Sequence, residues 1–359
     1  MNIYFRVDAS LNVGSGHVMR CLALADALQQ ADSQVNFIVR EHKGHMIATI
    51  EAAGFSVKKL PVTSIVNHSD ILGVSWQQDA AETIGALENK MPDWLIVDHY
   101  GIDQSWHQAL RTSVKNIFVI DDVPEKPIDC DLLLNQNLGY TDEDYNQLVS
   151  QDTQLILGPK YALLRSEFSN TRPEALKKRK KYNGTNNILI SLGALDINNL
   201  TESILDHLAT ITWPKPPQVN IVLGEHAPHF ESLKSKIKTY PLQLQLYKNS
   251  SNISELMLNA DIAIGGAGST AWERCCLGLP SLCFTLADNQ RAIAVELDRR
   301  KAAADLGKYE PQMIKVFLNL FNALLSDKNK WFEMSNKAFT ITTGQGTNLV
   351  TNRLLSVSA

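Results

Sequence analysis

The chain has 359 residues, of which 44% are hydrophobic and 20% are charged, a composition typical of globular proteins and unlike that of disordered or disulfide-rich chains. A formal net charge of -4 argues against an extended basic surface, so we expect no nucleic-acid partner. The five cysteines include no C-x-x-C pair, which indicates neither a disulfide framework nor a zinc ribbon and is typical of a reducing compartment.

The first residues and the hydropathy pattern both bear on location. Arg6 and Asp8 interrupt the first apolar run, which is therefore too short for the apolar segment of a signal peptide. No stretch reaches the roughly 18 consecutive apolar residues that a membrane span needs. We expect a cytoplasmic protein without a membrane partner, and we take it to be a monomer.

Short apolar runs rich in β-branched residues alternate with segments of helical periodicity. In the first half they lie at 2–7, 34–40, 94–100 and 116–122, and in the second half at 187–193, 218–224, 242–247, 261–266 and 281–286. This alternation predicts βαβ units and parallel sheets covered on both faces. The predicted fold class is α/β, with two doubly wound, Rossmann-like domains that face a central cleft at the carboxyl ends of their strands.

A segment without a sustained apolar stripe separates the two halves. It reads "RPEALKKRKKYNGTN", and it predicts an N-terminal domain at 1–171, a linker at 172–186 and a C-terminal domain at 187–359. The basic run at 177–181 is also compatible with a nuclear-localisation or nucleic-acid signal, but the rest of the chain supplies no matching basic surface. From Pro311 onward the spacing is helical, and an alternative is that this last segment crosses back onto the first domain.

The stretch "NVGSGHVMRCLALADAL" predicts a turn and a helix directly after the first strand. Gly14 and Gly16 remove side chains around Ser15, so backbone N–H groups at the helix start can approach an anion such as a phosphate. The spacing is neither G-x-G-x-x-G nor a P-loop, and a purely structural turn remains an alternative. His17 lies at the positive end of this helix, which disfavours imidazolium and leaves a neutral base, although a structural hydrogen-bonded histidine is also possible.

Polar side chains end two further strands of the first half. Asp98, His99 and Tyr100 follow one strand, and Asp121 and Asp122 follow another. Carboxylates at strand ends can orient an imidazole or bind a sugar hydroxyl. For Asp121 and Asp122 we favour the simpler interpretation that they cap the next helix.

The second half carries two polar turns. Asn199 lies at a predicted helix start, where it offers a cap or a polar contact. Gly266, Gly268 and Ser269 form a glycine-rich turn suited to a diphosphate, and Glu273 follows where its carboxylate can accept both hydroxyls of a ribose or act as a surface cap.

Two weaker signals complete the second half. Asn289 and Gln290 follow the next strand, and we expect both to bind substrate. The "HAPH" motif at 226–229 lacks a supporting carboxylate, so we predict neither a metal nor another cofactor.

Taken together, these blocks resemble the family of UDP-sugar hydrolases of pseudaminic acid biosynthesis, which act on UDP-2,4-diacetamido-2,4,6-trideoxy-β-L-altropyranose. The similar blocks are "RVDASLNVGSGHVMRCLALA", "DHYGID", "DDVPEKPIDCDLLLNQN", "GPKYALLRSEF", "NNLT", "GGAGSTAWERCCLGLPSL" and "ADNQ". The resemblance implies the GT-B architecture of the lipid-linked peptidoglycan glycosyltransferases. One departure is that Ala194 and Leu195 follow Gly193 where the family has glycines, which bears on substrate preference.

The resemblance also implies roles for individual residues. The family's catalytic base falls on His17, its sugar- or diphosphate-proximal residues on Tyr100 and Asn289, and its ribose-binding acid on Glu273. Arg165, in the "GPKYALLRSEF" block, is placed with the substrate-binding residues on the same basis.

The function that follows is removal of UDP by water, in a nucleotide-sugar diphosphatase. His17 would deprotonate a water that attacks the anomeric carbon, the C–O bond would break with inversion, and 2,4-diacetamido-2,4,6-trideoxy-L-altrose would be released for pseudaminic acid synthesis. Two alternatives remain: an inverting GT-B glycosyltransferase, in which His17 activates an acceptor hydroxyl, and a non-catalytic module that binds nucleotide sugars.

Overall fold

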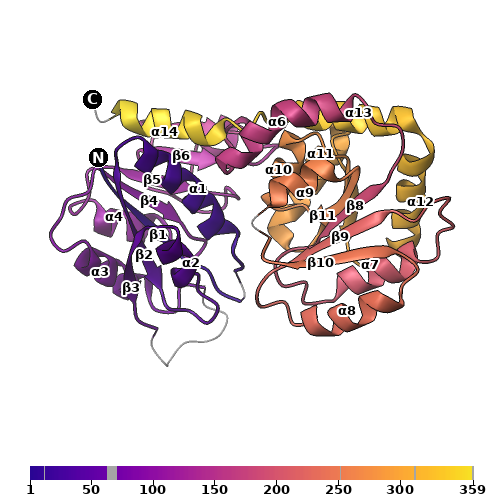
Figure 1. Cartoon of the computed structure of the whole chain (residues 1–359). Helices are drawn as coiled ribbons and strands as arrows, with labels where there is room; N and C mark the ends of the chain where they lie inside the picture. The colour runs from indigo at the N-terminus through magenta and orange to yellow at the C-terminus, as the bar shows by residue number, and fades with distance from the viewer. Residues whose placement is uncertain (12, 63–70, 251, 311–312, 358–359) are drawn as a thin grey trace. The chain divides into compact units, whose positions relative to one another are not determined.

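The computed structural model describes residues 1–11, 13–62, 71–250, 252–310 and 313–357 and divides the chain into two compact units (Figure 1). Unit 1 comprises Met1–Arg165 and Gln345–Ala359, and unit 2 comprises Ser166–Gly344. Each unit contains one parallel sheet with helices packed on it, so the predicted α/β class with two Rossmann-like domains and the GT-B architecture are confirmed.

The sheet of unit 1 has seven strands in the order β3-β2-β1-β4-β5-β6-β7. The strands are β1 (Asn2–Val7), β2 (Gln34–Arg40), β3 (Ser56–Leu60), β4 (Trp94–Asp98), β5 (Ile117–Ile120), β6 (Leu132–Asn135) and β7 (Gln154–Leu157). The helices are α1 (Gly16–Gln30), α2 (Ile47–Ala52), α3 (Trp76–Ala86), α4 (Gln104–Leu110), α5 (Asp142–Tyr145), the 3₁₀ turn η1 (Pro159–Tyr161) and α14 (Gly346–Val357). The chain reverses its direction of winding between β1 and β4, which makes the carboxyl ends of these two strands the expected ligand edge.

The sheet of unit 2 has six strands in the order β10-β9-β8-β11-β12-β13. The strands are β8 (Asn187–Ser191), β9 (Gln218–Leu223), β10 (Gln243–Lys248), β11 (Ile262–Gly266), β12 (Ser281–Thr285) and β13 (Ala304–Lys308). The helices are α6 (Ser166–Arg179), α7 (Leu200–Leu208), α8 (Phe230–Lys236), α9 (Ile253–Asn259), α10 (Thr270–Cys276), α11 (Arg291–Arg299), α12 (Met313–Ser326) and α13 (Lys328–Phe339), with 3₁₀ turns η2 (Ile237–Thr239) and η3 (Asp288–Gln290). The corresponding switch of winding lies between β8 and β11.

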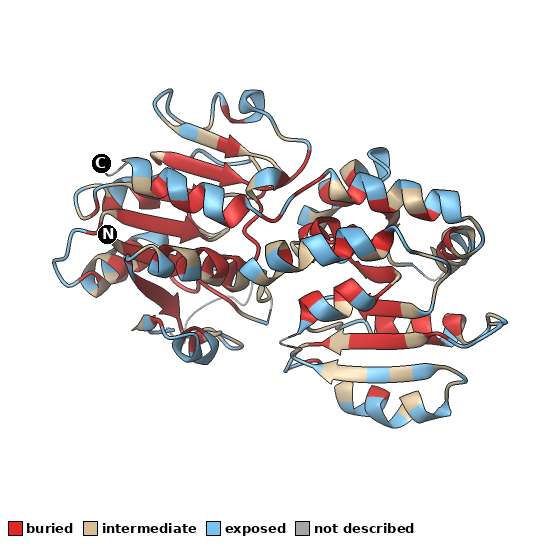
Figure 2. Cartoon of the chain, turned by 45° about the horizontal axis from the view of Figure 1, so that its top comes forward, coloured by how far each residue is buried: buried red, intermediate tan, exposed pale blue. Residues whose placement is uncertain are grey.

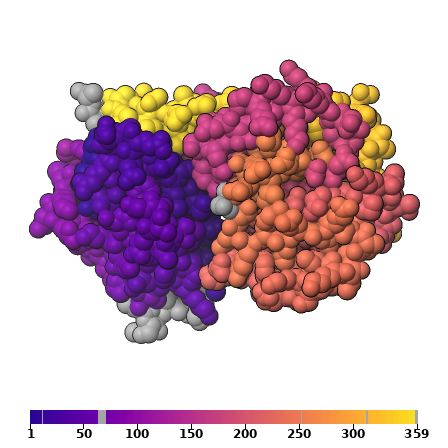
Figure 3. All heavy atoms as spheres, viewed as in Figure 1, coloured from indigo at the N-terminus to yellow at the C-terminus, as the bar shows by residue number. Residues whose placement is uncertain are grey.

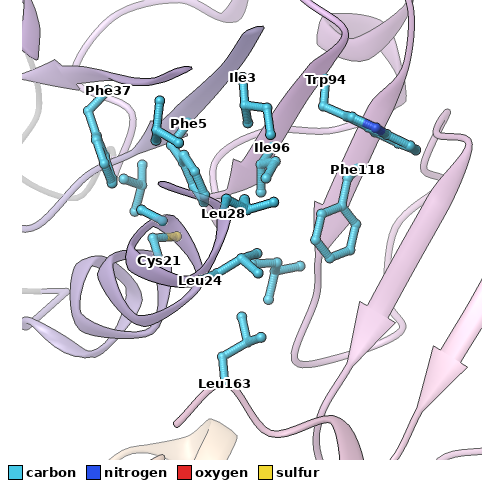
Figure 4. Close-up of a cluster of buried hydrophobic side chains, with 14 of the residues drawn as sticks. Ile3, Phe5, Cys21, Leu24, Leu28, Phe37, Trp94, Ile96, Phe118 and Leu163 are labelled. Carbon is cyan, nitrogen blue, oxygen red and sulfur yellow. The ribbon is translucent and has the colours of Figure 1, made fainter. Parts of the chain in front are cut away.

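The cores form where the apolar faces of helices meet the central strands. Figure 2 shows the strands as largely buried and the outer faces of most helices as exposed. In unit 1, Cys21, Leu24 and Leu28 of α1 point toward Phe5 and Ile96 of the sheet (Figure 4). This spacing of three and four residues is the apolar stripe of an amphipathic helix, so local periodicity accounts for the docking of α1.

The last helix, α14, packs in unit 1 rather than in the domain at 187–359. Val350 and Leu354 are fully buried in the core that α1 covers, and Trp94 Nε1 donates a hydrogen bond to the Leu354 carbonyl over 3.3 Å. Figure 3 shows α14 in yellow on the surface beside the indigo N-terminal segments. The predicted helical end is confirmed over 313–357, and the alternative in which it crosses back is the one observed; residues 311 and 312 lie outside the described part.

The predicted linker at 172–186 is replaced by helix α6 over its first half. Arg172 donates to the carbonyls of Cys276, Phe339 and Thr342 over 2.7 to 3.0 Å, which ties α6 to unit 2. Arg179, in the basic run, is buried and donates to the carbonyls of Met257, Ala260 and Leu277. Composition indicated a solvated segment because the run is basic. The packing of Arg172 and Arg179 could not be predicted, since their partners are backbone oxygens, which every residue type carries.

A buried ionic cluster holds α3 against the sheet of unit 1. Asp79 of α3 accepts hydrogen bonds from Arg6 of β1 over 2.6 and 3.2 Å, from Arg40 of β2 over 2.6 Å and from Trp106 of α4 over 2.9 Å. Burial by itself raises the pKa of Asp79, but the two guanidinium groups outweigh burial and lower this pKa below its usual range. Asp79 is therefore an ionised, fully paired buried carboxylate.

Candidate active site

Unit 1 places His17 and Asp98 on the two sides of its topological switch. His17 is the second residue of α1, which follows β1, and Asp98 is the last residue of β4. His17 Nδ1 lies 2.5 Å from Asp98 Oδ1, and both residues are buried. The sequence separation of 81 residues is bridged by the parallel pairing of β1 with β4.

The charge on Asp98 determines which nitrogen of His17 carries the proton. Burial alone raises the pKa of Asp98, but the charge of Arg20 and the hydrogen bonds from Arg20 and His17 outweigh burial and hold this pKa well below its usual range. An ionised carboxylate only accepts hydrogen bonds, so His17 Nδ1 must be the donor. Neutral His17 then has its lone pair on Nε2, the tautomer that a general base requires.

Arg20, which the sequence analysis missed, connects Asp98 to a second carboxylate. Its Nε and Nη2 donate to Asp98 over 2.6 and 2.7 Å, and its Nη1 and Nη2 donate to Asp122 over 2.7 and 3.0 Å. Arg20 Nη2 also lies 3.2 Å from His17 Nδ1, but two donors cannot bond each other, so this is a contact between neighbours. The three-residue spacing from His17 on one face of α1 is the signal that could have found Arg20.

Tyr100 completes this group of side chains. Its hydroxyl donates to Asp122 Oδ2 over 2.7 Å, and its ring meets that of His17 edge to face, with centroids 4.6 Å apart. Burial and the charge of Asp122 raise the pKa of Tyr100 well above its usual range, so Tyr100 is a phenol. Asn137 also donates to Asp122, over 3.0 Å. We use the term histidine network for the group formed by His17, Arg20, Asp98, Tyr100 and Asp122.

The predicted capping role of Asp121 and Asp122 is wrong. The next helix is α5, which begins at Asp142, and Asp122 instead binds Arg20 and Tyr100. Asp121 accepts a hydrogen bond from Tyr145 over 2.6 Å, and burial raises the pKa of Asp121 to about 6. His99, next to Asp98 in sequence, points elsewhere: its Nε2 lies 3.1 Å from Asp8 Oδ2 and its Nδ1 accepts from the Gly101 amide. Successive residues at a strand end face opposite sides of the sheet, which separates these two partners.

The turn before α1 is tight and open toward solvent. Gly14 has φ +80°, and its N–H donates to the Ser10 carbonyl over 2.9 Å. Apart from Gly14 and its chain neighbours, no atom of the described residues lies within 4 Å of the position that a Cβ would take. Position 14 therefore favours glycine because of its positive φ, and not because a neighbouring atom would collide with a side chain. Ser15 is the N-cap of α1 and makes no side-chain capping bond, and Gly16 is the first helical residue.

Unit 2 places its predicted residues after the carboxyl ends of β8, β11 and β12. A Cβ on Gly266 would lie 2.7 Å from Leu286 Cδ1, and a Cβ on Gly268 would lie 3.2 Å from Gln290 Nε2. Gln290 is held in place because its Oε1 accepts from the Leu286 amide over 3.1 Å. Ser269 is the N-cap of α10, Glu273 lies in the first turn of that helix, and Asn289 is exposed in η3.

The α7 turn differs from its prediction as a helix cap. Asn199 has left-handed backbone with φ 52° and directs its amide to Glu202 over 2.7 Å, while Oδ1 is buried without a hydrogen-bond partner within the described part of the chain. The cap is Asp196, which accepts from the amides of Leu200 and Thr201, each over 2.9 Å. A carboxylate thus already occupies the anion position at the start of α7.

The remaining predictions concern Arg165 and metals. Arg165 is half-buried at the end of the first segment of unit 1, and the hydrogen bonds given above for the histidine network are made without it. His229 of the "HAPH" motif lies 2.9 Å from the Ile197 carbonyl. Across 1–11, 13–62, 71–250, 252–310 and 313–357, no three His, Cys, Asp or Glu side chains are grouped as metal ligands would be. Over the same residues, no helix has the length and apolar character needed to cross a membrane.

Comparison with known proteins agrees with this architecture. Residues 188–349 match the glycosyltransferase family 28 C-terminal domain. The chain is 30% identical over 301 residues to the uncharacterized protein MJ1062 of Methanocaldococcus jannaschii, covering 81% of this chain but only 57% of that protein. It is 29% identical over 304 residues to the UDP-2,4-diacetamido-2,4,6-trideoxy-beta-L-altropyranose hydrolase of Campylobacter jejuni, covering 84% of this chain and 97% of that protein.

Solved structures show the same fold at low identity. MurG of Acinetobacter baumannii superposes with a TM-score of 0.71 at 16% identity, over 99% of each chain. UDP-GlcNAc 2-epimerase of Neisseria meningitidis gives a TM-score of 0.61 at 14% identity, over 99% of this chain and 100% of that one. The chain therefore has the GT-B fold, and its second unit is similar to the C-terminal domain of glycosyltransferase family 28.

Proposed function

We propose that this protein hydrolyses a UDP-sugar, with UDP-2,4-diacetamido-2,4,6-trideoxy-β-L-altropyranose as its substrate. The observation that carries the proposal is the contact of His17 Nδ1 with ionised Asp98, which leaves Nε2 as the basic nitrogen. The similarity to the Campylobacter jejuni hydrolase supports the choice of substrate. All five cysteines are buried free thiols, the state that a reducing compartment maintains, so we also propose a cytoplasmic location.

In the proposed reaction, His17 Nε2 accepts a proton from water while the water oxygen bonds to the anomeric carbon. The bond between that carbon and the diphosphate oxygen breaks, and UDP leaves with the bonding electron pair. Attack opposite the leaving group inverts the anomeric centre. Asp98 stabilises the imidazolium that forms, and Arg20 holds Asp98 in place through two hydrogen bonds.

The remaining predicted residues are proposed to bind substrate. The turn that contains Gly266, Gly268 and Ser269 would bind the diphosphate, with Glu273 at the ribose hydroxyls. Gln290 and Leu286 shape this turn from the adjacent loop. Gly14, Ser15, Gly16, Tyr100, Arg165, Asn199 and Asn289 are proposed to contact the diphosphate or the sugar.

The test of the base is the His17→Phe variant. We expect no release of UDP above the uncatalysed rate, with UDP affinity unchanged in calorimetry. Exposed His45 provides the matched control, because His45→Phe should retain wild-type turnover. Turnover by His17→Phe protein would refute the assignment. Reaction in water labelled with heavy oxygen should place the label in the sugar, whereas label in UDP would mean attack at phosphorus.

A glycosyltransferase is the second candidate, because residues 188–349 match a glycosyltransferase domain and MurG shares the fold. In that reaction His17 would deprotonate an acceptor hydroxyl instead of water. Release of free sugar from purified protein and UDP-sugar, with no acceptor present, decides for the hydrolase. Absence of turnover combined with UDP-sugar binding would instead favour a binding module.

A further inference from the structure

Arg274 of α10 is a buried cation without a carboxylate partner in the part of the chain that the structure describes. Arg274 is only 2% exposed to solvent. Nη2 donates to the Gly266 carbonyl over 2.7 Å and approaches Cys283 Sγ at 3.4 Å, and Nη1 donates to Thr270 Oγ1 over 3.2 Å. Nε has no hydrogen-bond partner among the described residues. All of these partners are neutral, while the guanidinium is permanently charged.

The other buried arginines differ from Arg274, because negative charge or a helix dipole compensates each of them. Arg6, Arg20 and Arg40 are each paired with two carboxylates. Arg179 has carbonyl partners at the carboxyl ends of α9 and α10, where the helix dipoles are negative. A buried charge that lacks such compensation is costly, and a protein retains it most readily where a ligand supplies the opposite charge.

The position of the Arg274 guanidinium indicates where such a negatively charged ligand would bind. A Cβ on Gly265 would lie 2.7 Å from Arg274 Nη1 and 3.0 Å from the Ser191 carbonyl, so the guanidinium lies directly against the end of β11. Gly265 and Gly266 form that strand end, and the turn to α10 follows at the carboxyl edge of the sheet. Three glycines within Gly265–Gly268 carry no side chains of their own, and the side chains of Leu286 and Gln290 pack against Gly266 and Gly268. The positive charge thus lies against the buried start of one short segment, Gly265–Ser269, whose later residues Gly268 and Ser269 are half-buried.

We propose that Arg274 is the counter-charge for the diphosphate that binds at the Gly265–Ser269 turn. This inference rests on the proposed function, which assigns the diphosphate to that turn. Arg274 acts through the backbone of the turn and does not touch substrate, so it is a positioning residue and not a catalytic one. Cleavage of the bond to the sugar adds negative charge to the leaving diphosphate, so the same cation favours the products of the reaction over the bound substrate.

The size of the effect follows from Coulomb's law. The pair consists of the Arg274 guanidinium and one negative charge of the diphosphate. At a separation of about 8 Å and an effective dielectric constant of about 20, this pair changes the affinity for the ligand roughly 30-fold. The contribution scales with ligand charge, and it is absent for uridine. A residue that only shapes the turn would instead change the affinities for uridine, UMP and UDP by similar factors.

The test measures Kd for UDP, UMP and uridine by calorimetry in wild-type, Arg274→Gln and Arg274→Lys proteins. Gln keeps a donor for the Gly266 carbonyl but removes the charge, and Lys keeps the charge. We expect Arg274→Gln to bind UDP at least about tenfold more weakly with its uridine affinity unchanged, and Arg274→Lys to recover most of the loss. Arg299→Gln, an exposed change of the same type on α11, should leave all affinities at wild-type values.

Each contrary outcome has a distinct meaning. An unchanged ratio of UDP to uridine affinity in Arg274→Gln protein overturns the inference and leaves the proposed function standing. Failure of wild-type protein to bind UDP overturns the proposed function and the inference together. Removal of an uncompensated charge should not lower the melting temperature of the ligand-free protein, so unfolding of both Arg274→Gln and Arg274→Met variants would also overturn the inference.

Discussion

Replacement of Asp98 by asparagine isolates the role of the carboxylate in the histidine network. Asp98 accepts from His17 Nδ1 over 2.5 Å and from two nitrogens of Arg20 over 2.6 and 2.7 Å. The asparagine side chain has one oxygen acceptor and one NH₂ donor in place of the two acceptors. If Arg20 takes the oxygen, the NH₂ group faces His17 Nδ1, which must then accept, and the imidazole proton moves to Nε2. His17 can no longer accept a proton from water at Nε2.

The expected magnitude has two parts. Loss of the correct tautomer should reduce kcat by about 10²- to 10⁴-fold, the range set by general-base catalysis and by tautomer inversion at buried aspartate–histidine pairs. Removal of one partner from a buried ion pair should also lower the free energy of unfolding by about 3 kcal/mol, because Arg20 retains Asp122 but loses half of its compensation. UDP affinity should stay the same, since Asp98 is buried and is not among the residues proposed to contact UDP.

The assay is steady-state UDP release together with urea unfolding and calorimetry with UDP. Asp26→Asn, on the exposed face of the same helix as His17, is the matched control and should match wild type in all three measurements. A folded Asp98→Asn protein whose kcat stays within about threefold of wild type would refute the tautomer argument. An unchanged kcat with lower stability would mean that Asp98 has only a structural role.

Three further outcomes are expected for stability. Burial raises the folded-state pKa of Asp121 to about 6 from an unfolded value of about 3.9, so its stabilising contribution is complete below pH 4 and is lost as the pH rises through 6. Asp121→Asn, which keeps an acceptor for Tyr145, should therefore gain about 2 kcal/mol relative to wild type between pH 4.5 and 7 in urea unfolding; a constant difference would contradict this. Asp79→Asn should lower the free energy of unfolding by about 3 to 5 kcal/mol, because two buried guanidinium groups lose their shared charge; a loss under about 1 kcal/mol would exclude that role. Leu354→Ala should cost about 2 to 5 kcal/mol, whereas exposed Leu349→Ala on the same helix should change stability by less than about 0.5 kcal/mol, and equal losses would argue against packing of α14 in unit 1.

Local signals in the sequence predicted many of the strands and helices and the positions where they end. Runs of apolar and β-branched residues at 2–7, 34–40, 187–193 and 261–266 became strands, because a short continuous apolar run reports burial of a strand on both faces whatever its partner. Missed strands such as β3 and β7 have weaker patterns, with exposed or half-buried residues along them. Their positions at the two edges of the sheet explain the weakness, since edge strands bury less surface.

The sequence by itself determined the α/β class, the glycine turns and the placement of His17 at a helix start, because each depends on residues within one or two turns of chain. Only the tertiary structure decided that Asp98 orients His17, that Arg20 joins Asp98 to Asp122, and that α14 belongs to unit 1. These contacts join residues 78 to 102 positions apart, and for α14 as many as 260. Which strand ends meet depends on strand order, and periodicity within a strand carries no record of its neighbours.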